Sequence, residues 1–429
     1  MLKSKQKILF VVDELPFPPR NGVTIPIYHF IIGLRKYYEI ALLLIVKEND
    51  NIDDEILNNN RSIVDHFFVL KIRNACFLSA LCREFFLISP SFSGLGGEFF
   101  KNDGFKITKF DPDIIFCSPI RAIANLKFIK NILIDRDRRV VAAISDAYTA
   151  TLRMHSKQIF GYCWPMTHRV KSVASWLRSF WMMFLERKIL NEADVILVQT
   201  SMDREWICKI SNSRFKDRTY ILSNGVNKKL LETIKVEYRR SFGYIGSLKN
   251  PCHKININFL IKNILPKIQN KYYDAKFFVL GKSDCSGLSS LLKVNSGVVY
   301  KEYVHDMVEF YTSVPILFVR NFKNIGLINR TIESMAAGVV VIGEKGAFNG
   351  IEGFQDGVHG FIAQDEDQIL KYLFLLFDNP KKWYEVSSNA KKLIKNDFQW
   401  EDRLGCLNDL LMLKEKGASG SSGPPLDRQ

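Results

Sequence analysis

The chain has 429 residues, of which 47% are hydrophobic and 24% charged, a composition typical of a soluble globular protein with two or three domains. Its 60 Lys and Arg residues exceed its 45 Asp and Glu residues, and this net charge of +15 indicates either anionic partners or a solubilising basic surface. The eight cysteines form no CxxC pair, which excludes a zinc signature, argues against a disulfide framework and indicates a reducing, cytoplasmic compartment.

Short apolar runs rich in β-branched and aromatic residues alternate with helical patterns along the chain. The predicted strands are 7–12, 40–46, 66–70, 113–117, 139–144 and 195–199 in the first half, and 241–245, 275–280, 297–300, 316–319, 339–342 and 360–363 in the second. Continuous apolar strands separated by helices are typical of parallel sheets covered on both faces. The pattern predicts an α/β fold with two doubly wound, Rossmann-like sheets.

A strand, a Gly- or Pro-rich loop and a helix follow one another at the start of each half. The first loop spans 13–22 and the second 246–251, and the helices are predicted over 25–36 and 256–270. Loops at the carboxyl ends of parallel strands form ligand crevices, so both loops are candidate site elements. We expect an N-terminal domain over 1–235, a C-terminal domain over 236–400, a helix over 401–415 that is free to pack back toward the N-terminal domain, and a flexible Gly/Ser/Pro-rich linker over 416–429.

Residues 170–192 combine aromatic side chains with Lys and Arg. One interpretation is a basic amphipathic surface that contacts an anionic membrane or a lipid-linked acceptor. The other, which we favour from the spacing, is a long helix that buries an aromatic stripe in the N-terminal core.

The segment with the clearest chemistry spans 324–342. A loop containing Gly326 precedes a short predicted helix, which ends at Gly338 before a buried strand. N–H groups at a helix start bind phosphate oxygens, and Arg330 in the first turns can pair with a diphosphate. Glu333 lies on the same face and can accept hydrogen bonds from ribose hydroxyls. The alternative is an Arg330–Glu333 ion pair on a solvated helix face.

This segment, N-I-G-L-I-N-R-T-I-E-S-M-A-A-G-V-V-V, resembles the donor-site motif of GT-B glycosyltransferases, particularly the retaining family 4 group (glycosyl transferases group 1). Segments similar to other motifs of the family follow in the family's order, at 17–29, 220–227, 242–248, 277–281 and 346–363. The resemblance extends from about 7 to 400. It implies two Rossmann-like domains facing each other across a cleft, with the acceptor on the N-terminal side and the donor on the C-terminal side.

The resemblance also implies roles for individual residues. Glu333 corresponds to the second glutamate of the family's Glu-x7-Glu motif, which binds the nucleotide ribose, and Arg330 stands where Lys is usual. Basic side chains in the loop after the second domain's first strand approach the pyrophosphate, and a turn near 303 contacts the base. The expected donor-binding residues are Gly22, Gly246, Ser247, Lys249, Lys254, Tyr303, Val304, Gly326, Asn329, Arg330 and Glu333, with Arg330 also catalytic because it stabilises the leaving group.

The chain departs from the motif at Ile325, where the family has its first glutamate, and at Val339, where it has Pro. That glutamate contacts the transferred sugar, so the resemblance does not imply which sugar is recognised. Asp146 follows a predicted strand and corresponds to a segment where relatives carry Asp near the acceptor. It is a candidate catalytic residue for acceptor contact or proton transfer, with a helix N-cap as the alternative. Arg121 and His155 are weaker candidates.

We expect a glycosyltransferase that moves a hexose-type unit from a nucleotide sugar to a glycan, lipid-linked or protein acceptor, with retention and without a metal or other cofactor. A non-catalytic nucleotide-sugar or glycan-binding subunit and a nucleotide-sugar epimerase are the alternatives. No nucleic-acid-binding motif accompanies the positive charge. We expect a cytoplasmic protein in peripheral contact with the anionic inner face of the membrane, with many of the excess cations on the N-terminal domain.

Overall fold

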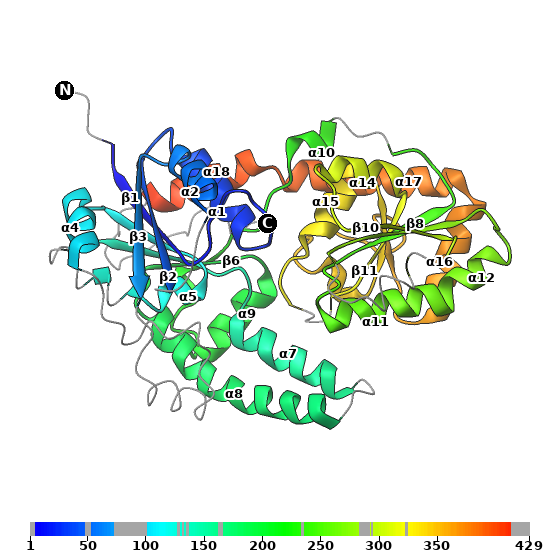
Figure 1. The fold of residues 1–429 in the computed structure, drawn as a ribbon, viewed down its shortest axis with the longest axis horizontal. Coiled ribbons are helices and arrows are strands. Elements are labelled where there is room, and N and C mark those ends of the chain that lie inside the picture. Colours follow the sequence, from blue (N-terminus) through cyan, green and yellow to red (C-terminus); the bar gives the residue numbers. More distant parts are fainter. Residues whose placement is uncertain are drawn as a thin grey trace. The chain divides into compact units, whose positions relative to one another are not determined.

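The computed structural model describes residues 5–47, 53–72, 101–126, 129–130, 133, 137–161, 166–232, 236–282, 292, 295–321 and 325–412. The chain forms two compact units, one made of residues 1–224 and 401–429 and the other of residues 225–400 (Figure 1). Each unit contains one sheet whose paired strands are parallel. The predicted pair of doubly wound sheets is confirmed.

The sheet of unit 1 has seven strands in the order β3-β2-β1-β4-β5-β6-β7. Its strands are β1 (Lys7–Val12), β2 (Glu39–Lys47), β3 (His66–Ile72), β4 (Ile114–Cys117), β5 (Arg139–Ala143), β6 (Val195–Val198) and β7 (Thr219–Ile221). The apolar side chains of the five central strands are almost all buried because helices cover the sheet, as the continuous apolar runs predicted, whereas Phe67, Phe68 and Val69 of the edge strand β3 are only partly buried. The sequence analysis missed β7, a three-residue strand that is partly exposed.

The helices of unit 1 are α1 (Thr24–Leu34), α2 (Asp54–Ser62), α4 (Lys101–Phe110), α5 (Ile120–Ile123), α7 (Tyr148–Gly161), α8 (Met166–Leu190), α9 (Ser201–Ile210), the 3-10 turn η2 (Lys216–Arg218) and α18 (Trp400–Met412). The long helices α7 and α8 run side by side and extend away from the sheet (Figure 1). The favoured interpretation of 170–192 is therefore wrong. The helix exists, but several of its aromatic side chains are exposed, and the buried residues among those described on α8 are instead Ser172, Ser179, Met182, Glu186, Ile189 and Leu190.

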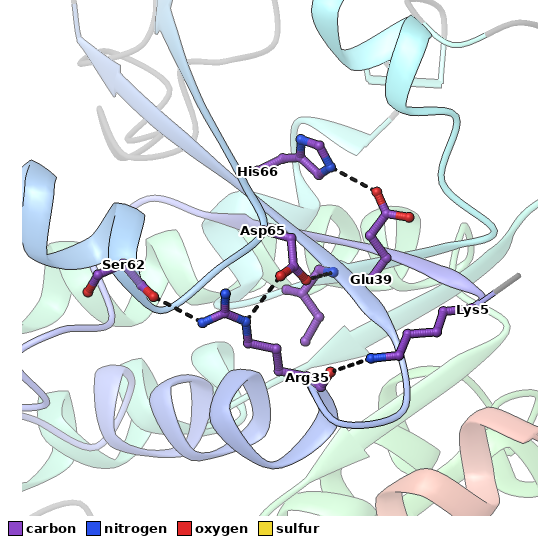
Figure 2. Close-up of polar contacts among 7 residues, drawn as sticks. Lys5, Arg35, Glu39, Ser62, Asp65 and His66 are labelled. Carbon is purple, nitrogen blue, oxygen red and sulfur yellow. Dashed lines mark hydrogen bonds and ion pairs between the residues drawn. The ribbon is translucent and has the colours of Figure 1, made fainter.

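A polar cluster joins the elements at the amino edge of this sheet (Figure 2). Arg35, which ends α1, donates from Nε to Asp65 Oδ1 at 3.1 Å and from Nη1 to the carbonyl of Ser62 at 3.0 Å. Asp65 in turn accepts from the backbone N–H of Ile40 at 2.9 Å, and His66 lies 2.8 Å from Glu39. These contacts connect α1, α2, β2 and β3 at the edge opposite the strand ends where ligands bind, so the cluster is structural.

The sheet of unit 2 has six strands in the order β10-β9-β8-β11-β12-β13. They are β8 (Ser241–Ile245), β9 (Lys276–Leu280), β10 (Val298–Lys301), β11 (Ile316–Val319), β12 (Val340–Gly343) and β13 (Phe361–Ile362). The helices are α10 (Lys228–Glu232), α11 (Pro251–Phe259), the π-helical η3 (Leu260–Ile264), α12 (Leu265–Gln269), α14 (Met307–Ser313), α15 (Asn329–Ala337), the 3-10 turn η4 (Lys345–Phe348), α16 (Glu366–Asp378) and α17 (Pro380–Asp397). In Figure 1, α14, α15 and α17 lie on one side of this sheet and α11 and α12 on the other.

The boundary between the units differs from the predicted one. The chain enters unit 2 at Gly225, eleven residues before the expected start at 236, because residues 225–232 pack with unit 2. There the N–H of Val226 donates to the carbonyl of Phe398 at 2.8 Å, and a Cβ at Gly225 would lie 2.7 Å from the ring of Trp400. The chain returns to unit 1 after Trp400, and α18 packs there, with the carbonyl of Leu411 accepting from Arg139.

The excess positive charge is not concentrated on the N-terminal side, so that prediction is wrong. Unit 1 contains 36 Lys and Arg against 28 Asp and Glu, a net charge of +8. Unit 2 contains 24 against 17, a net charge of +7, in fewer residues. The predicted linker at 416–429 lies outside the described residues.

Candidate functional site

The strand order of unit 2 reverses between the parallel strands β8 and β11, because the chain continues from β8 to β9 on one side of the sheet and from β11 to β12 on the other. Ligands of open α/β sheets bind at the carboxyl ends of the strands at such a point. The residues there are Gly246 after β8, Arg320 after β11, Glu344 after β12 and the first turn of α15. This edge therefore contains the candidate site of unit 2.

The loop between β8 and α11 is held by close backbone packing. The N–H of Gly246 donates to the carbonyl of Leu280 at 3.0 Å, and a Cβ at Gly281 would lie 1.9 Å from the carbonyl oxygen of Gly246. A Cβ at Gly246 would lie 2.6 Å from Nδ1 of His253. Asn250 caps α11 by accepting from the N–H of Cys252 at 2.9 Å. Glycine is thus required at 246 and 281 to bring the loop against α11.

Helix α15 carries Arg330 and Glu333 in its first turns. Its N-cap is Ile328, whose side chain has no acceptor atom and makes no capping hydrogen bond. Its end matches the prediction, because Gly338 adopts the left-handed conformation with φ of 85°. The start of a helix beside a guanidinium can receive an anionic group.

Glu333 is only partly exposed and faces α14. The hydroxyl of Tyr311 donates to its Oε2 at 3.1 Å. Burial raises the pKa of Glu333 from 4.5 to about 7, although the Tyr311 hydrogen bond and the charge of Arg330 oppose this rise. Arg330 donates to the carbonyl of Arg320 at 3.4 Å, and no ion pair joins it to Glu333 in the described residues. The alternative of a solvated Arg330–Glu333 pair is therefore wrong.

A chain of polar contacts that the sequence analysis missed crosses the carboxyl ends of β8, β11 and β12. Arg320 pairs with Glu344 at 2.6 Å and donates to Asn256 Oδ1 at 3.0 Å. Asn256 donates to the hydroxyl of Tyr244 at 2.9 Å, and that hydroxyl lies 2.7 Å from His253 Nδ1. The contacts join residues up to 64 positions apart in the sequence. They fix α11 against the strand ends where Arg330 lies.

His253, at the end of this chain of contacts, is influenced by the charge of Arg330. Burial lowers the pKa of His253 from 6.5 to about 4, and the positive charge of Arg330 lowers it further. Its imidazole is therefore neutral at pH 7. Because the His253 ring is neutral, the Arg330 guanidinium carries the positive charge that can pair with an anionic ligand.

The predicted donor residues of unit 2 divide into two groups. Gly246 packs against His253 and the charge of Arg330 acts on the same ring, while Asn329 and Glu333 lie on the same helix as Arg330. The loop before that helix is anchored by Asn321, whose side chain donates to the carbonyl of Ile325 at 3.3 Å. Ile325 is buried, and Gly326 adopts a positive φ of 74° that suits glycine.

The other predicted donor residues lie in two other places of unit 2. Ser247 and Lys249 are exposed in the turn before α11, and Lys254 is half-buried on α11. Tyr303 is 72% exposed, with its ring 5.3 Å from His305, and Val304 is buried. They follow β10, the edge strand of the sheet. Their predicted roles stay predictions.

In unit 1, the strand order reverses between β1 and β4, and the loop that contains Gly22 leaves β1. Asn60 of α2 holds this loop by accepting from the N–H of Phe17 at 3.0 Å and donating to its carbonyl at 2.6 Å. The N–H groups of Val23 and Thr24 donate to the side chain of Asn21 at 2.8 and 2.9 Å. Gly22 is exposed, but the next two amides of the loop are already bonded. Its predicted contact with donor phosphates stays a prediction.

Asp13 and Arg121 form an ion pair at the ends of β1 and β4, with Arg121 Nε 2.5 Å from Asp13 Oδ2. Hydrogen bonding to Asp13 helps to raise the pKa of Arg121 against the effect of burial. The guanidinium of Arg121, a weaker candidate from the sequence, is therefore paired with Asp13. The side chain of His155 lies outside the described residues.

Asp146 lies directly before α7, but two buried carboxyls serve the start of that helix. Asp203 accepts from the N–H of Ala147 at 3.0 Å, and Glu186 accepts from the N–H of Tyr148 at 2.9 Å. Burial raises the pKa of Glu186 to about 7 and that of Asp203 to about 6. The helix thus obtains caps from α8 and α9, and the acceptor-side role of Asp146 stays a prediction.

A small cavity of about 20 Å³ lies at the carboxyl ends of β4 to β7. Its lining includes Ile27 and Phe30 of α1, Ser118, Ser145 and Gln199. This volume holds about one water-sized group, whereas small-molecule pockets measure about 300–1,000 Å³. In the described part of the chain, no three His, Cys, Asp or Glu side chains are grouped as they would be to hold a metal ion.

Comparison with known proteins connects this geometry to a family. Residues 239–379, which form most of unit 2 and include Arg330 and Glu333, match the family model described as glycosyl transferases group 1. A comparison with curated proteins found no significant match. The predicted resemblance to GT-B glycosyltransferases is confirmed, while membership of the retaining family 4 stays a prediction.

The solved structures that match this chain have the same fold, and the matches cover both of its units. HepE from Anabaena in complex with UDP is 13% identical, with a TM-score of 0.63, and the match covers 95% of this chain and 99% of that chain. Sucrose-phosphate synthase from Thermosynechococcus elongatus is 13% identical, with a TM-score of 0.64 and coverage of 95% and 98%. A putative UDP-N-acetylglucosamine 2-epimerase from Listeria monocytogenes is 12% identical, with a TM-score of 0.54 and coverage of 95% and 96%. The fold is GT-B.

Proposed function

We propose that the protein is a glycosyltransferase whose nucleotide-sugar donor binds unit 2 at the first turns of α15. The observation that carries the proposal is the arrangement of Arg330 and Glu333 at the carboxyl edge of the sheet. A guanidinium at the start of a helix suits a diphosphate, and a partly buried carboxylate one turn later suits the two ribose hydroxyls. These residues lie within the segment that matches glycosyl transferases group 1.

In this reaction Arg330 is the catalytic cation. When the bond between the sugar and the diphosphate breaks, negative charge develops on the departing diphosphate. The guanidinium of Arg330 and the N–H groups of α15 stabilise that charge, which supports transfer without a metal ion or other cofactor. HepE, one of the proteins with this fold, binds UDP and UDP-glucose, so UDP-hexoses are the first donors to test.

The transferred sugar meets a different surface from the one implied by the family motif. Ile325 is buried and offers no carboxylate, but its loop is held by Asn321 and turns at Gly326. We propose that backbone N–H groups of this loop bind the sugar hydroxyls. Transfer proceeds with retention onto a glycan, lipid-linked or protein acceptor at unit 1, where Asp146 is the candidate contact.

Two other functions share this fold. The putative epimerase from Listeria has it as well, although the sequence shows no recognisable set of acid and base residues for epimerisation. A non-catalytic sugar-nucleotide-binding subunit is the other, and Ile325 is the residue that favours it. Release of free nucleotide that depends on an added acceptor distinguishes a transferase from both, because neither alternative passes the sugar to an acceptor.

The test is a nucleotide-release assay with UDP-, GDP-, ADP- and CMP-sugars and a panel of glycan acceptors, with and without EDTA. We expect release from one donor class that EDTA leaves unchanged, and a loss of about 100-fold or more in Arg330→Ala. The anomeric configuration of the product, read by NMR, tests retention. Glu352→Gln, an exposed carboxylate outside the site, is the control. Turnover that Arg330→Ala leaves intact would contradict the assigned site.

A further inference from the structure

Helix α8 presents a row of apolar side chains that are 39–63% exposed. Its exposed members recur every three or four residues, at Val170, Val173, Leu177, Phe180 and Phe184, with Trp176 and Trp181 beside them. Val170, Trp181 and Phe184 are each more than 60% exposed. The spacing places these side chains along one stripe, here named the α8 face, which is about 21 Å long at 1.5 Å per residue. A patch of this size on a soluble protein marks an interaction surface.

The net charge of α7 and α8 indicates the sign of the charge that a partner of the α8 face should have. Together α7 and α8 contain seven Lys and Arg residues, whereas Glu186 is their one acidic residue. Glu186 is buried and occupied with the N–H groups of Tyr148 and Thr149. A net charge of +6 thus falls on 39 residues of a chain whose total is +15. The partner is expected to be anionic.

The α8 face is held in place by α7. Arg153 of α7 donates from Nε to the hydroxyl of Ser179 at 3.0 Å, and its guanidinium lies 4.5 Å from the ring centre of Phe180. On the buried side of α8, Ser172 donates to the carbonyl of Ser156 at 2.5 Å. Contacts between α7 and α8 therefore hold the α8 face in its conformation before any partner binds.

We propose that the α8 face lies on an anionic lipid bilayer, with Trp181 and Phe184 inserted at the level of the headgroups. Trp and Phe beside basic residues are the composition of helices that lie in the plane of a membrane interface. No helix in the described part of the chain is long and apolar enough to cross a bilayer. A second copy of the chain is a poorer occupant, since two faces of the same positive charge would meet. The inference stands on these side chains and does not depend on the proposed function.

The test uses the full chain in vesicle flotation. Vesicles of phosphatidylcholine alone are compared with vesicles that also contain phosphatidylglycerol. We expect binding to the anionic vesicles, weakened by added salt, and little binding to the neutral ones. Trp181→Ser combined with Phe184→Ser should weaken the partition coefficient by about 100-fold, because each large apolar side chain contributes about tenfold. Lys188→Gln, which removes an exposed charge from α8, should weaken it about fivefold.

The matched control is Tyr273→Ser combined with Tyr384→Ser, two exposed aromatic residues of unit 2, which should leave binding unchanged. Melting curves by circular dichroism establish that each variant is folded. Equal binding of wild type and the Trp181/Phe184 variant would overturn the proposal, as would equal binding to neutral and anionic vesicles. A dimer that this variant dissociates, without vesicle binding, would assign the face to a second copy. A monomer that binds neither vesicle would mean that another part of the chain covers it.

Discussion

Replacing Glu333 by Gln should make unit 2 more stable while removing the carboxylate needed by the ligand. Burial raises the pKa of Glu333 from 4.5 to about 7, so the folded protein holds a carboxylate at a site that disfavours its charge. Gln has the same shape, and its amide oxygen can accept the hydrogen bond from Tyr311 that Oε2 accepts at 3.1 Å. The substitution therefore removes the charge and keeps the contact.

The size of the effect follows from the pKa. Below pH 4.5 the carboxyl is protonated in both folded and unfolded chains, so the variant gains nothing. Between pH 4.5 and 7 the folded wild type binds more protons than the unfolded chain, so its free energy of unfolding falls as pH rises. Above pH 7 the full difference is present, at most about 3 kcal/mol for this rise in pKa. The attraction between Glu333 and Arg330 opposes the rise in pKa and is already included in this figure.

Urea denaturation at pH 4.5, 6 and 8 measures this difference through the transition of unit 2. We expect Glu333→Gln to match the wild type at the lowest pH and to exceed it at pH 8. Glu352→Gln, an exposed carboxylate on the same unit, should show no pH-dependent difference. A variant that is less stable than the wild type at pH 8, or shifted equally at all three values, would refute the reasoning.

Two further substitutions test the loops at the strand ends. Asn60→Ala leaves the N–H and carbonyl of Phe17 without their partners, so urea denaturation should show a loss of about 2–3 kcal/mol, whereas the exposed neighbour Asn59→Ala should change little. Equal effects of the two would mean that Asn60 does not hold the loop. Gly281→Ala places a methyl group 1.9 Å from the Gly246 carbonyl and should cost about 2–3 kcal/mol. Gly405→Ala, in a helix with nothing within 4 Å, should instead add about 0.5–1 kcal/mol, and a stable Gly281→Ala protein would show that the loop can shift.

The parts of the fold that the sequence predicted are those with local causes. Buried parallel strands leave continuous apolar runs, and α15 ends where Gly338 supplies the left-handed conformation. The first turns of α15 were likewise recognised, because Arg330 and Glu333 are one turn apart in the sequence. The start of unit 2 was placed too late, because Gly225 and Val226 join it through Phe398 and Trp400 at the far end of the domain.

The parts that were missed depend on long-range contacts. Arg320 meets Asn256 across 64 positions, so no spacing rule could have placed the polar chain from Glu344 to His253. His253 could have been noticed as a His one turn into a helix after the glycine loop, but its burial could not. In α8 the three- and four-residue spacing predicts a stripe, whereas which stripe is covered depends on where α7 packs.

Titration calorimetry with UDP, GDP, ADP and CMP tests the central claim most directly, because it measures the donor site before any acceptor is known. The account predicts that one nucleotide binds the wild type and the Glu352→Gln control equally. The same nucleotide should bind Glu333→Ala about 30-fold or more weakly, since ribose loses hydrogen bonds to a charged group. Binding that Glu333→Ala leaves unchanged, or no binding of any nucleotide to the wild type, would contradict the assignment of the donor site to α15.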